Sequence, residues 1–76
     1  MKALTTKYVG PTDHSGSRII ASEPDGKRVI KSWDSELSDI DNHREAAYAL
    51  LDKMAWKGKL AGGFQKPRTY VWVFVG

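Results

Sequence analysis

The chain contains no cysteine, so it can form no disulfide and offers no thiolate as a nucleophile or metal ligand. No stretch approaches the roughly 20 consecutive apolar residues of a membrane-spanning helix, and the N-terminus lacks an apolar run of signal length. Histidine is also scarce, with two in 76 residues, which leaves little material for a metal centre. The length of 76 residues predicts one domain over residues 1–76, and the absences lead us to expect a cytoplasmic protein without a cofactor.

Acidic residues are missing from the last third of the chain. Residues 33–52 carry six Asp or Glu side chains and one Arg, whereas residues 53–76 carry five basic side chains and no acid. The net charge of +3 is modest, and its distribution is the more informative property. The basic end is a candidate surface for an anionic partner. A solvated surface explains the same pattern, because lysine-rich exteriors are ordinary in soluble domains.

Three segments in the first half of the chain have the composition and alternation of β-strands. They are Lys2–Val9, Ser17–Ser22 and Lys27–Trp33. A glycine-bounded loop separates the first two. The second and third are joined by the turn Glu23–Gly26, in which Pro24 presets φ and Gly26 accepts the left-handed conformation. We therefore expect a hairpin from Ser17 to Trp33.

An amphipathic helix of about four turns is expected after the acidic stretch. Its apolar stripe comprises Ala46, Ala47, Leu50, Leu51 and Met54. Asp39 or Asp41 can cap the N-terminus, where acids also suit the helix dipole. Gly58 can end the helix in the left-handed conformation.

The C-terminal segment Thr69–Val75 is the strongest strand signal, because every residue is β-branched or aromatic. Both of its faces are apolar, which favours a central strand or one that pairs with a second copy in a homodimer. Lys59–Phe64 is either a short strand or a loop, and Gln65–Arg68 is predicted to be a turn. The predicted fold is α+β in the order βββα(β)β, a mainly antiparallel sheet of four or five strands with one helix on one face. The other face should remain open, and it is where we expect function.

Catalytic and metal-binding patterns are weak in this sequence. His14 and His43 have no partners at ligand spacing, and no serine has a nucleophile-elbow context. Asp39, Asp41 and His43 form a D-x-D-x-H string that could bind a metal, although helix capping with a solvated histidine is the favoured interpretation. Gly62-Gly63 before two cations could approach a phosphate, but an ordinary turn is favoured. We expect no enzyme activity.

The positive signal is a set of cations beside alternating aromatics near the C-terminus. The candidate nucleic-acid-binding residues are Lys57, Lys59, Lys66, Arg68, Tyr70 and Trp72. In such a platform the cations follow phosphates and the rings stack on bases, each for about 1–3 kcal/mol. The alternative is that these aromatic side chains form the core of a small domain.

The pattern of three strands and a helix over Lys2–Trp56 resembles the AP2 and integrase arm-type DNA-binding domains. The stretch Val29–Asp34, followed by Glu45–Leu50, is similar to the last strand and the alanine-rich helix of that arrangement. The resemblance implies a sheet that enters the major groove of DNA. The chain departs from the pattern by an acidic insert before the helix and an apolar strand after it.

Most of the chain also resembles small bacteriophage and prophage proteins of unknown activity. The stretches that carry this resemblance are Lys2–Thr12, Gly16–Ala21, Asn42-His43 with Ala46-Ala47, Met54–Gly63 and Tyr70–Phe74. It implies an accessory role in the host cytoplasm. The leading hypothesis is a non-enzymatic module that binds nucleic acid, or a complex that handles it, through the basic C-terminal surface. The alternatives are a protein-binding inhibitor of a host defence system and a structural accessory protein.

Overall fold

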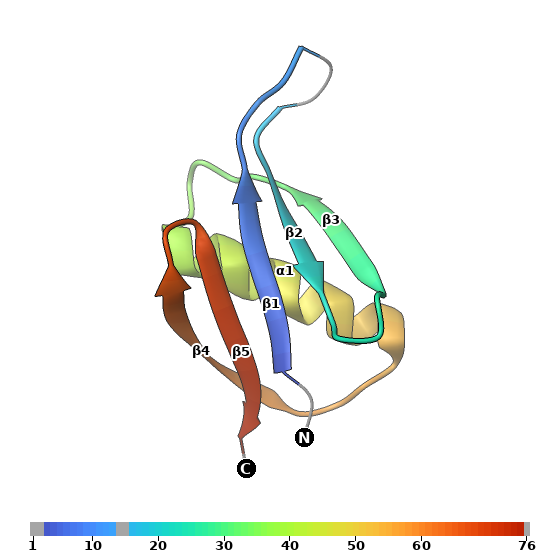
Figure 1. Cartoon of the computed structure of the whole chain (residues 1–76). Helices are drawn as coiled ribbons and strands as arrows, with labels where there is room; N and C mark the ends of the chain where they lie inside the picture. Colours follow the sequence, from blue (N-terminus) through green and yellow to red (C-terminus); the bar gives the residue numbers. More distant parts are fainter. Residues whose placement is uncertain (1–2, 14–15, 76) are drawn as a thin grey trace.

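A five-stranded antiparallel sheet carries a single helix across one of its faces (Figure 1). The computed structural model describes residues 3–13 and 16–75, so Lys2, His14 and Ser15 lie outside the described residues. The elements are β1 (Ala3–Val9), β2 (Arg18–Ser22), β3 (Arg28–Ser32), α1 (Asp39–Met54), β4 (Lys59–Lys66) and β5 (Thr69–Val75). The strand order is β3-β2-β1-β5-β4. The predicted α+β class is confirmed, with five strands.

The β2–β3 hairpin forms as the sequence predicts. The backbone N–H of Gly26 donates to the carbonyl of Glu23 at 3.0 Å, and the N–H of Glu23 donates to the carbonyl of Lys27 at 3.0 Å. Gly26 has φ 100°, which a residue with a Cβ rarely adopts. The glycine therefore closes the hairpin for the reason expected.

Both ends of α1 differ in detail from the prediction. Ser38 is the N-cap, because its extended backbone lets the hydroxyl accept from the N–H of Asp41 at 3.3 Å. Asp39 and Asp41 instead occupy the first turn, where their charge favours the helix dipole. The helix ends at a left-handed Ala55 with φ 57°, three residues before Gly58. The expected caps at Asp39 or Asp41 and at Gly58 are therefore wrong.

Asn42 anchors the loop that precedes the helix. Its side-chain oxygen accepts from the N–H of Asp34 at 2.8 Å. Its amide nitrogen donates to the carbonyls of Asp34, Leu37 and Ser38 at 2.9, 3.3 and 3.2 Å. One buried side chain thus fixes the path of the chain between the end of β3 and the first turn of α1.

The ambiguous segment after the helix is a full strand, β4, although it contains two consecutive glycines. Gly62 lies opposite Trp72 in the neighbouring strand, and a Cβ on Gly62 would overlap the indole ring. A glycine in this strand therefore permits close packing of the largest core side chain. The turn that follows is shorter than expected, because Lys66 already pairs with Thr69 across the two turn residues Pro67 and Arg68.

β5 lies inside the sheet and forms hydrogen-bonded ladders with β1 and with β4. The expectation of a central strand is confirmed. Because both edges of β5 are already paired, its backbone is not available to pair with a second copy, and the predicted homodimer through this strand has no free edge.

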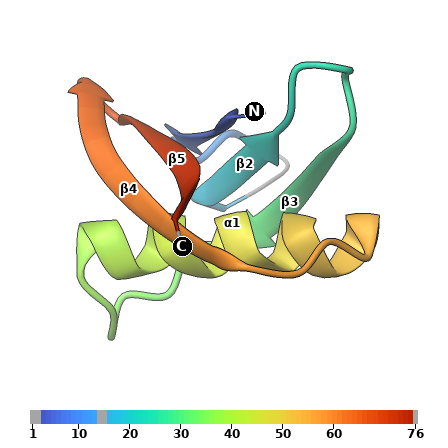
Figure 2. The same cartoon turned by 90° about the horizontal axis from the view of Figure 1, so that it is seen from below.

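The core lies between α1 and one face of the sheet (Figure 2). Its buried apolar members are Leu4, Ile19, Ala21, Ala46, Ala47, Leu50, Leu51, Leu60 and Trp72. Tyr70 and Phe74 pack against this cluster, so the aromatic row of β5 faces the helix. The opposite face, called the open face below, is left uncovered by α1. Across residues 3–13 and 16–75, no helix has the length and apolar character required to cross a membrane.

Candidate functional site

The cations predicted to form one C-terminal cluster are separated by the β4–β5 hairpin. Lys59 is the first residue of β4 and pairs with Val75, whereas Lys66 is its last residue and pairs with Thr69. A strand rises about 3.3 Å per residue, so the two lysines are roughly 23 Å apart along β4. Lys57 belongs to the first end and Arg68 to the second. The structure therefore does not bring the four predicted cations together.

Trp72 is not part of any binding surface. Its side chain is 0% exposed, and its indole N–H donates to the hydroxyl of Thr6 at 2.8 Å. The expectation that this ring stacks on a ligand is wrong, because a domain of this size needs its largest side chain in the core. Tyr70, by contrast, is half-buried and lines a hollow described below.

The charges of the molecule are segregated by face. None of the described strand residues is an Asp or Glu. The strand positions that alternate away from the helix include Lys7, Arg18, Arg28 and Lys59, and the register shift between Phe64 and Lys66 brings Lys66 to the same face. Six of the nine acids fall in residues 33–52, which form α1 and the loop before it. The open face is thus basic, and the helix side is acidic.

Three of these cations surround a hollow of about 340 Å³ on the open face. Lys7 pairs with Thr69, and Thr69 pairs with Lys66, so the two lysines belong to one row across the sheet. Arg28 belongs to the next row, where it pairs with Ser22. We call this feature the basic hollow, lined by Lys7, Arg28, Lys66, Thr5, Ser22, Thr69, Ile20 and Gln65. It combines cations and hydroxyl groups with no carboxylate.

Of the predicted site residues, Lys66 lies in the basic hollow and the other cations do not. Lys7 and Arg28 were missed because they lie in the first half of the chain. Their strands reach β4 and β5 only through the pairing of β1 with β5, which no local pattern announces. The available signal was the absence of acids from every predicted strand, which was visible in the sequence.

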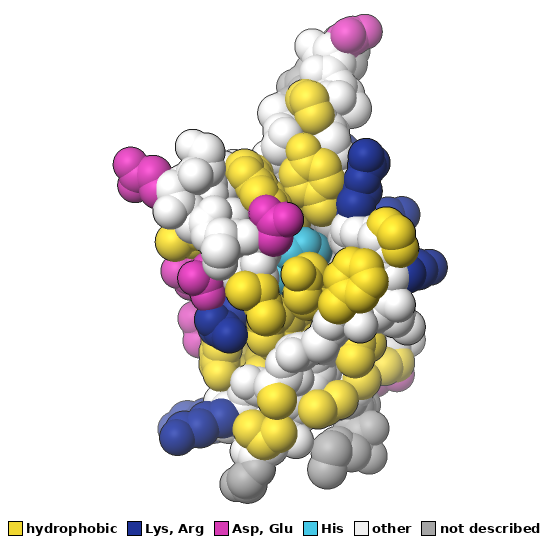
Figure 3. Space-filling model, turned by 90° about the vertical axis from the view of Figure 1, so that its left-hand side faces the viewer, with side chains coloured by type: hydrophobic (Ala, Val, Ile, Leu, Met, Phe, Trp, Pro, Cys, Tyr) yellow, Lys and Arg dark blue, Asp and Glu magenta, His cyan; other side chains and the backbone are white. Residues whose placement is uncertain are grey.

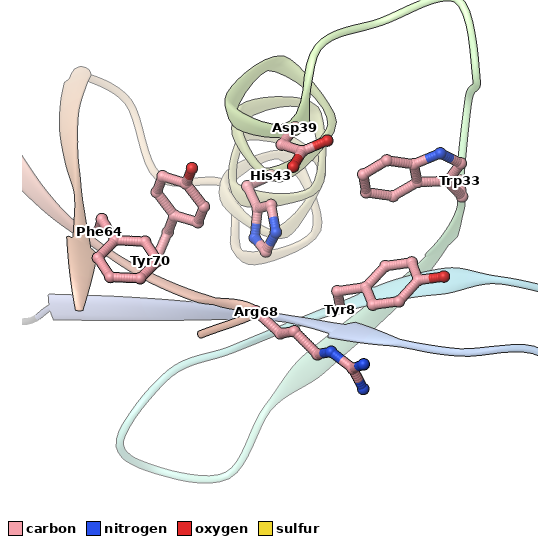
Figure 4. Close-up of a pocket in the computed structure, with 7 residues that line it drawn as sticks. All are labelled: Tyr8, Trp33, Asp39, His43, Phe64, Arg68 and Tyr70. Atoms are coloured by element: carbon pink, nitrogen blue, oxygen red, sulfur yellow. The ribbon is translucent and has the colours of Figure 1, made fainter. Parts of the chain in front are cut away.

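A second hollow, of about 360 Å³, opens between the first turn of α1 and the sheet (Figure 3). We call it the aromatic hollow. It is lined by Tyr8, Trp33, Asp39, His43, Phe64, Arg68 and Tyr70. Figure 4 shows Phe64 and Tyr70 on one side, Tyr8 and Trp33 on the other, and His43 between them.

His43 is held at the base of this hollow by a buried network. Its side chain is 2% exposed, and its Nδ1 lies 2.7 Å from the Thr6 hydroxyl, which also accepts from Trp72. Burial lowers the pKa of His43 below 6.5, and the contact with Thr6 and the charge of Asp39 oppose that shift less strongly. The interpretation of His43 as a solvated residue is therefore wrong. Its position three residues before Ala46 continues the apolar stripe and could have indicated burial.

The D-x-D-x-H string does not assemble a metal site. Asp41 forms an ion pair with Arg44 on the helix surface, while His43 faces the core. In the part of the chain that the structure describes, no three His, Asp or Glu side chains are grouped closely enough to hold a metal ion. The glycines Gly62 and Gly63 lie in the middle of β4 and not in a phosphate-binding loop.

Comparisons of the chain with protein-family models, with curated proteins and with solved structures gave no match. The two hollows and the segregation of charge between the faces are the features of the molecule that bear on its function.

Proposed function

We propose that this protein is a non-enzymatic module that binds nucleic acid through the open face of its sheet. The observation that carries the proposal is the basic hollow, where Lys7, Arg28 and Lys66 converge on a face with no strand carboxylate. Phosphate contacts supply most of the affinity in sequence-independent binding. Hydroxyl groups of Thr5, Ser22 and Thr69 add hydrogen-bonding groups for the phosphate oxygens.

The charge of the helix side also favours binding of nucleic acid at the open face. α1 and the loop before it contain most of the acids, so a polyanion approaching that side meets like charge. The resemblance to domains that place a sheet against DNA agrees with the same face, although analogy of fold does not fix function. We therefore assign binding to the basic hollow of the open face and not to the C-terminal third of the chain.

Counterion release sets the loss of affinity expected when cations of the basic hollow are removed. Each phosphate neutralised on a single strand changes log K by about 0.7 per tenfold change in salt, which is a factor of about five in affinity at 0.1 M salt. Removing two cations from the basic hollow should therefore weaken binding about 25-fold under these conditions.

The test compares two double variants that each remove two positive charges. Lys7→Gln with Lys66→Gln alters the basic hollow, whereas Lys31→Gln with Lys57→Gln changes exposed lysines outside it. Affinity is measured by fluorescence anisotropy for a short single-stranded oligonucleotide and for a duplex. We expect a loss of about 25-fold in the first variant and less than about threefold in the second. Equal losses would show that only net charge matters and would refute a specific surface.

A protein partner is the second candidate, because the open face also exposes apolar side chains. Ile30, Val73 and Val75 are 57%, 38% and 44% exposed. Such a surface suits the inhibitor of a host system that the phage resemblance implies. Binding that survives high salt and is lost on replacing Val73 by Asp would favour this candidate, whereas phosphate-driven binding weakens steeply with salt.

A further inference from the structure

The aromatic side chains that line the aromatic hollow suit a planar ligand. Phe64 and Tyr70 meet edge to face with centroids 5.9 Å apart, and Tyr8 and Trp33 do the same at 5.0 Å. The two pairs lie on opposite sides of His43 (Figure 4). Phe64 is 67% exposed, so one wall is a large apolar ring left in water. A planar ligand that covers this ring would remove that apolar area from solvent.

The polar groups of the hollow are few and convergent. The Nδ1 atom of His43 is engaged by Thr6, which leaves Nε2 as the ring nitrogen available to a ligand. Trp72 donates to the Thr6 oxygen, and when the Thr6 hydroxyl in turn donates to Nδ1, the neutral imidazole carries its proton on Nε2. The carboxylate of Asp39, one helical turn before His43, adds an acceptor at the rim. A donor beside an acceptor matches the edge of a nucleobase.

Arg68 occupies a backbone conformation that favours glycine. It follows Pro67 in the tight β4–β5 turn and has φ 67°. A side chain at such a position is unfavourable by comparison with glycine. Its guanidinium lies 5.9 Å from the centre of the Tyr8 ring, at the sheet side of the hollow. Arg68 therefore places a cation at the edge of the aromatic hollow, although its backbone conformation is less favourable for arginine than for glycine.

We infer that the aromatic hollow binds an unpaired base of a single-stranded nucleic acid, with Arg68 contacting the adjoining phosphate. Asp39 disfavours a phosphate inside the hollow, so the base enters and the backbone stays outside. Lys66, two residues before Arg68, continues the cationic path from the edge of the aromatic hollow to the basic hollow. This inference rests on the proposed function and extends it, because the hollow on the helix side takes one base of a strand whose phosphate backbone is held by the cations of the open face.

The experiment uses two single-stranded oligonucleotides of equal length and charge, one with all its bases and one made of abasic sites. The variants are Phe64→Ala, in the hollow, and Val75→Ala, an exposed control at the far end of β5. Phe64→Ala should lower affinity for the complete strand about tenfold and leave affinity for the abasic strand unchanged. Val75→Ala should change neither, and the exposed position of both residues preserves the fold.

A second variant separates binding from stability. Arg68→Gly should leave the melting temperature unchanged or raise it, because glycine suits the turn, and yet weaken binding of the complete strand about fivefold. An unchanged affinity would remove Arg68 from the proposed phosphate contact and overturn that part of the inference.

The remaining outcomes distinguish the inference from the proposal on which it rests. If both strands bind and Phe64→Ala affects neither, the base site is refuted and the open-face proposal stands. If neither strand binds, the open-face proposal fails and the inference fails with it. If a nucleoside monophosphate binds as tightly as the complete strand, the hollow is a site for free nucleotides, which contradicts a base held as part of a strand.

Discussion

Replacing Thr6 by Val is the sharpest perturbation of the buried network under the aromatic hollow. The substitution keeps the shape of the side chain and removes only its hydroxyl. In the native protein that hydroxyl accepts from the Trp72 indole at 2.8 Å and lies 2.7 Å from Nδ1 of His43. All three side chains are buried, with 0%, 0% and 2% exposure for Thr6, Trp72 and His43. The variant therefore leaves two buried polar groups without a partner.

The expected loss of stability follows from those two groups. A buried polar atom left unpaired costs about 1–3 kcal/mol, so the variant with two such atoms should lose about 2–6 kcal/mol of unfolding free energy. A domain of this length has about 4–11 kcal/mol in total. The melting temperature should then fall by about 10 °C or more. Binding should weaken as well, because the imidazole of His43 loses the hydrogen bond that fixes its orientation.

Urea unfolding followed by tryptophan fluorescence and by circular dichroism measures the effect. Thr69→Val is the matched control, because Thr69 is 4% exposed on the opposite face of the sheet and lies outside this network. The control should change stability by less than about 1 kcal/mol. A loss below about 1 kcal/mol in Thr6→Val as well would refute the reasoning that this hydroxyl satisfies both neighbours.

Three further predictions concern packing, pH and the loop before the helix. Gly62→Ala should cost about 2 kcal/mol or more because its Cβ overlaps Trp72, whereas Gly63→Ala meets nothing within 4 Å and should be neutral or stabilising in the same urea titration. Stability should fall as pH drops below 6.5, because unfolded His43 takes up a proton that the buried side chain, with its lowered pKa, does not bind. His43→Gln should lack this slope, and an identical slope would exclude the residue as its source. Asn42→Asp should cost about 2 kcal/mol, since a carboxylate cannot donate to the three carbonyls that the amide contacts, and an unchanged melting temperature would contradict that contribution.

Most strands and the helix of this fold could be predicted from local patterns in the sequence. Alternation predicted the first three strands, Pro24 and Gly26 of the turn Glu23–Gly26 predicted the hairpin, and apolar spacing predicted the helix. The strand β4 was ambiguous because Gly62 and Gly63 lower its strand propensity. The reason for Gly62 is its contact with Trp72 in the next strand, which propensity does not contain.

The candidate site was harder to predict, because it depends on which strands become neighbours. Lys59 and Lys66 are close in sequence but lie at opposite ends of β4, whereas Lys7 and Lys66 are far apart in sequence and share one row of the sheet. The pairing of β1 with β5 determines both facts. Distance along the sequence therefore did not show which cations share a row, while the absence of acids from the predicted strands indicated which face is basic.

The salt dependence of oligonucleotide binding tests the basic open face most directly. Affinity for a single strand is measured at several salt concentrations for the native protein and for Lys7→Gln with Lys66→Gln. The slope of log K against log salt should be about −2 or steeper for the native protein, and about 1.4 units shallower in the variant, because two phosphate contacts are lost. A native affinity that does not depend on salt, or equal slopes in the two proteins, would contradict phosphate binding at this face.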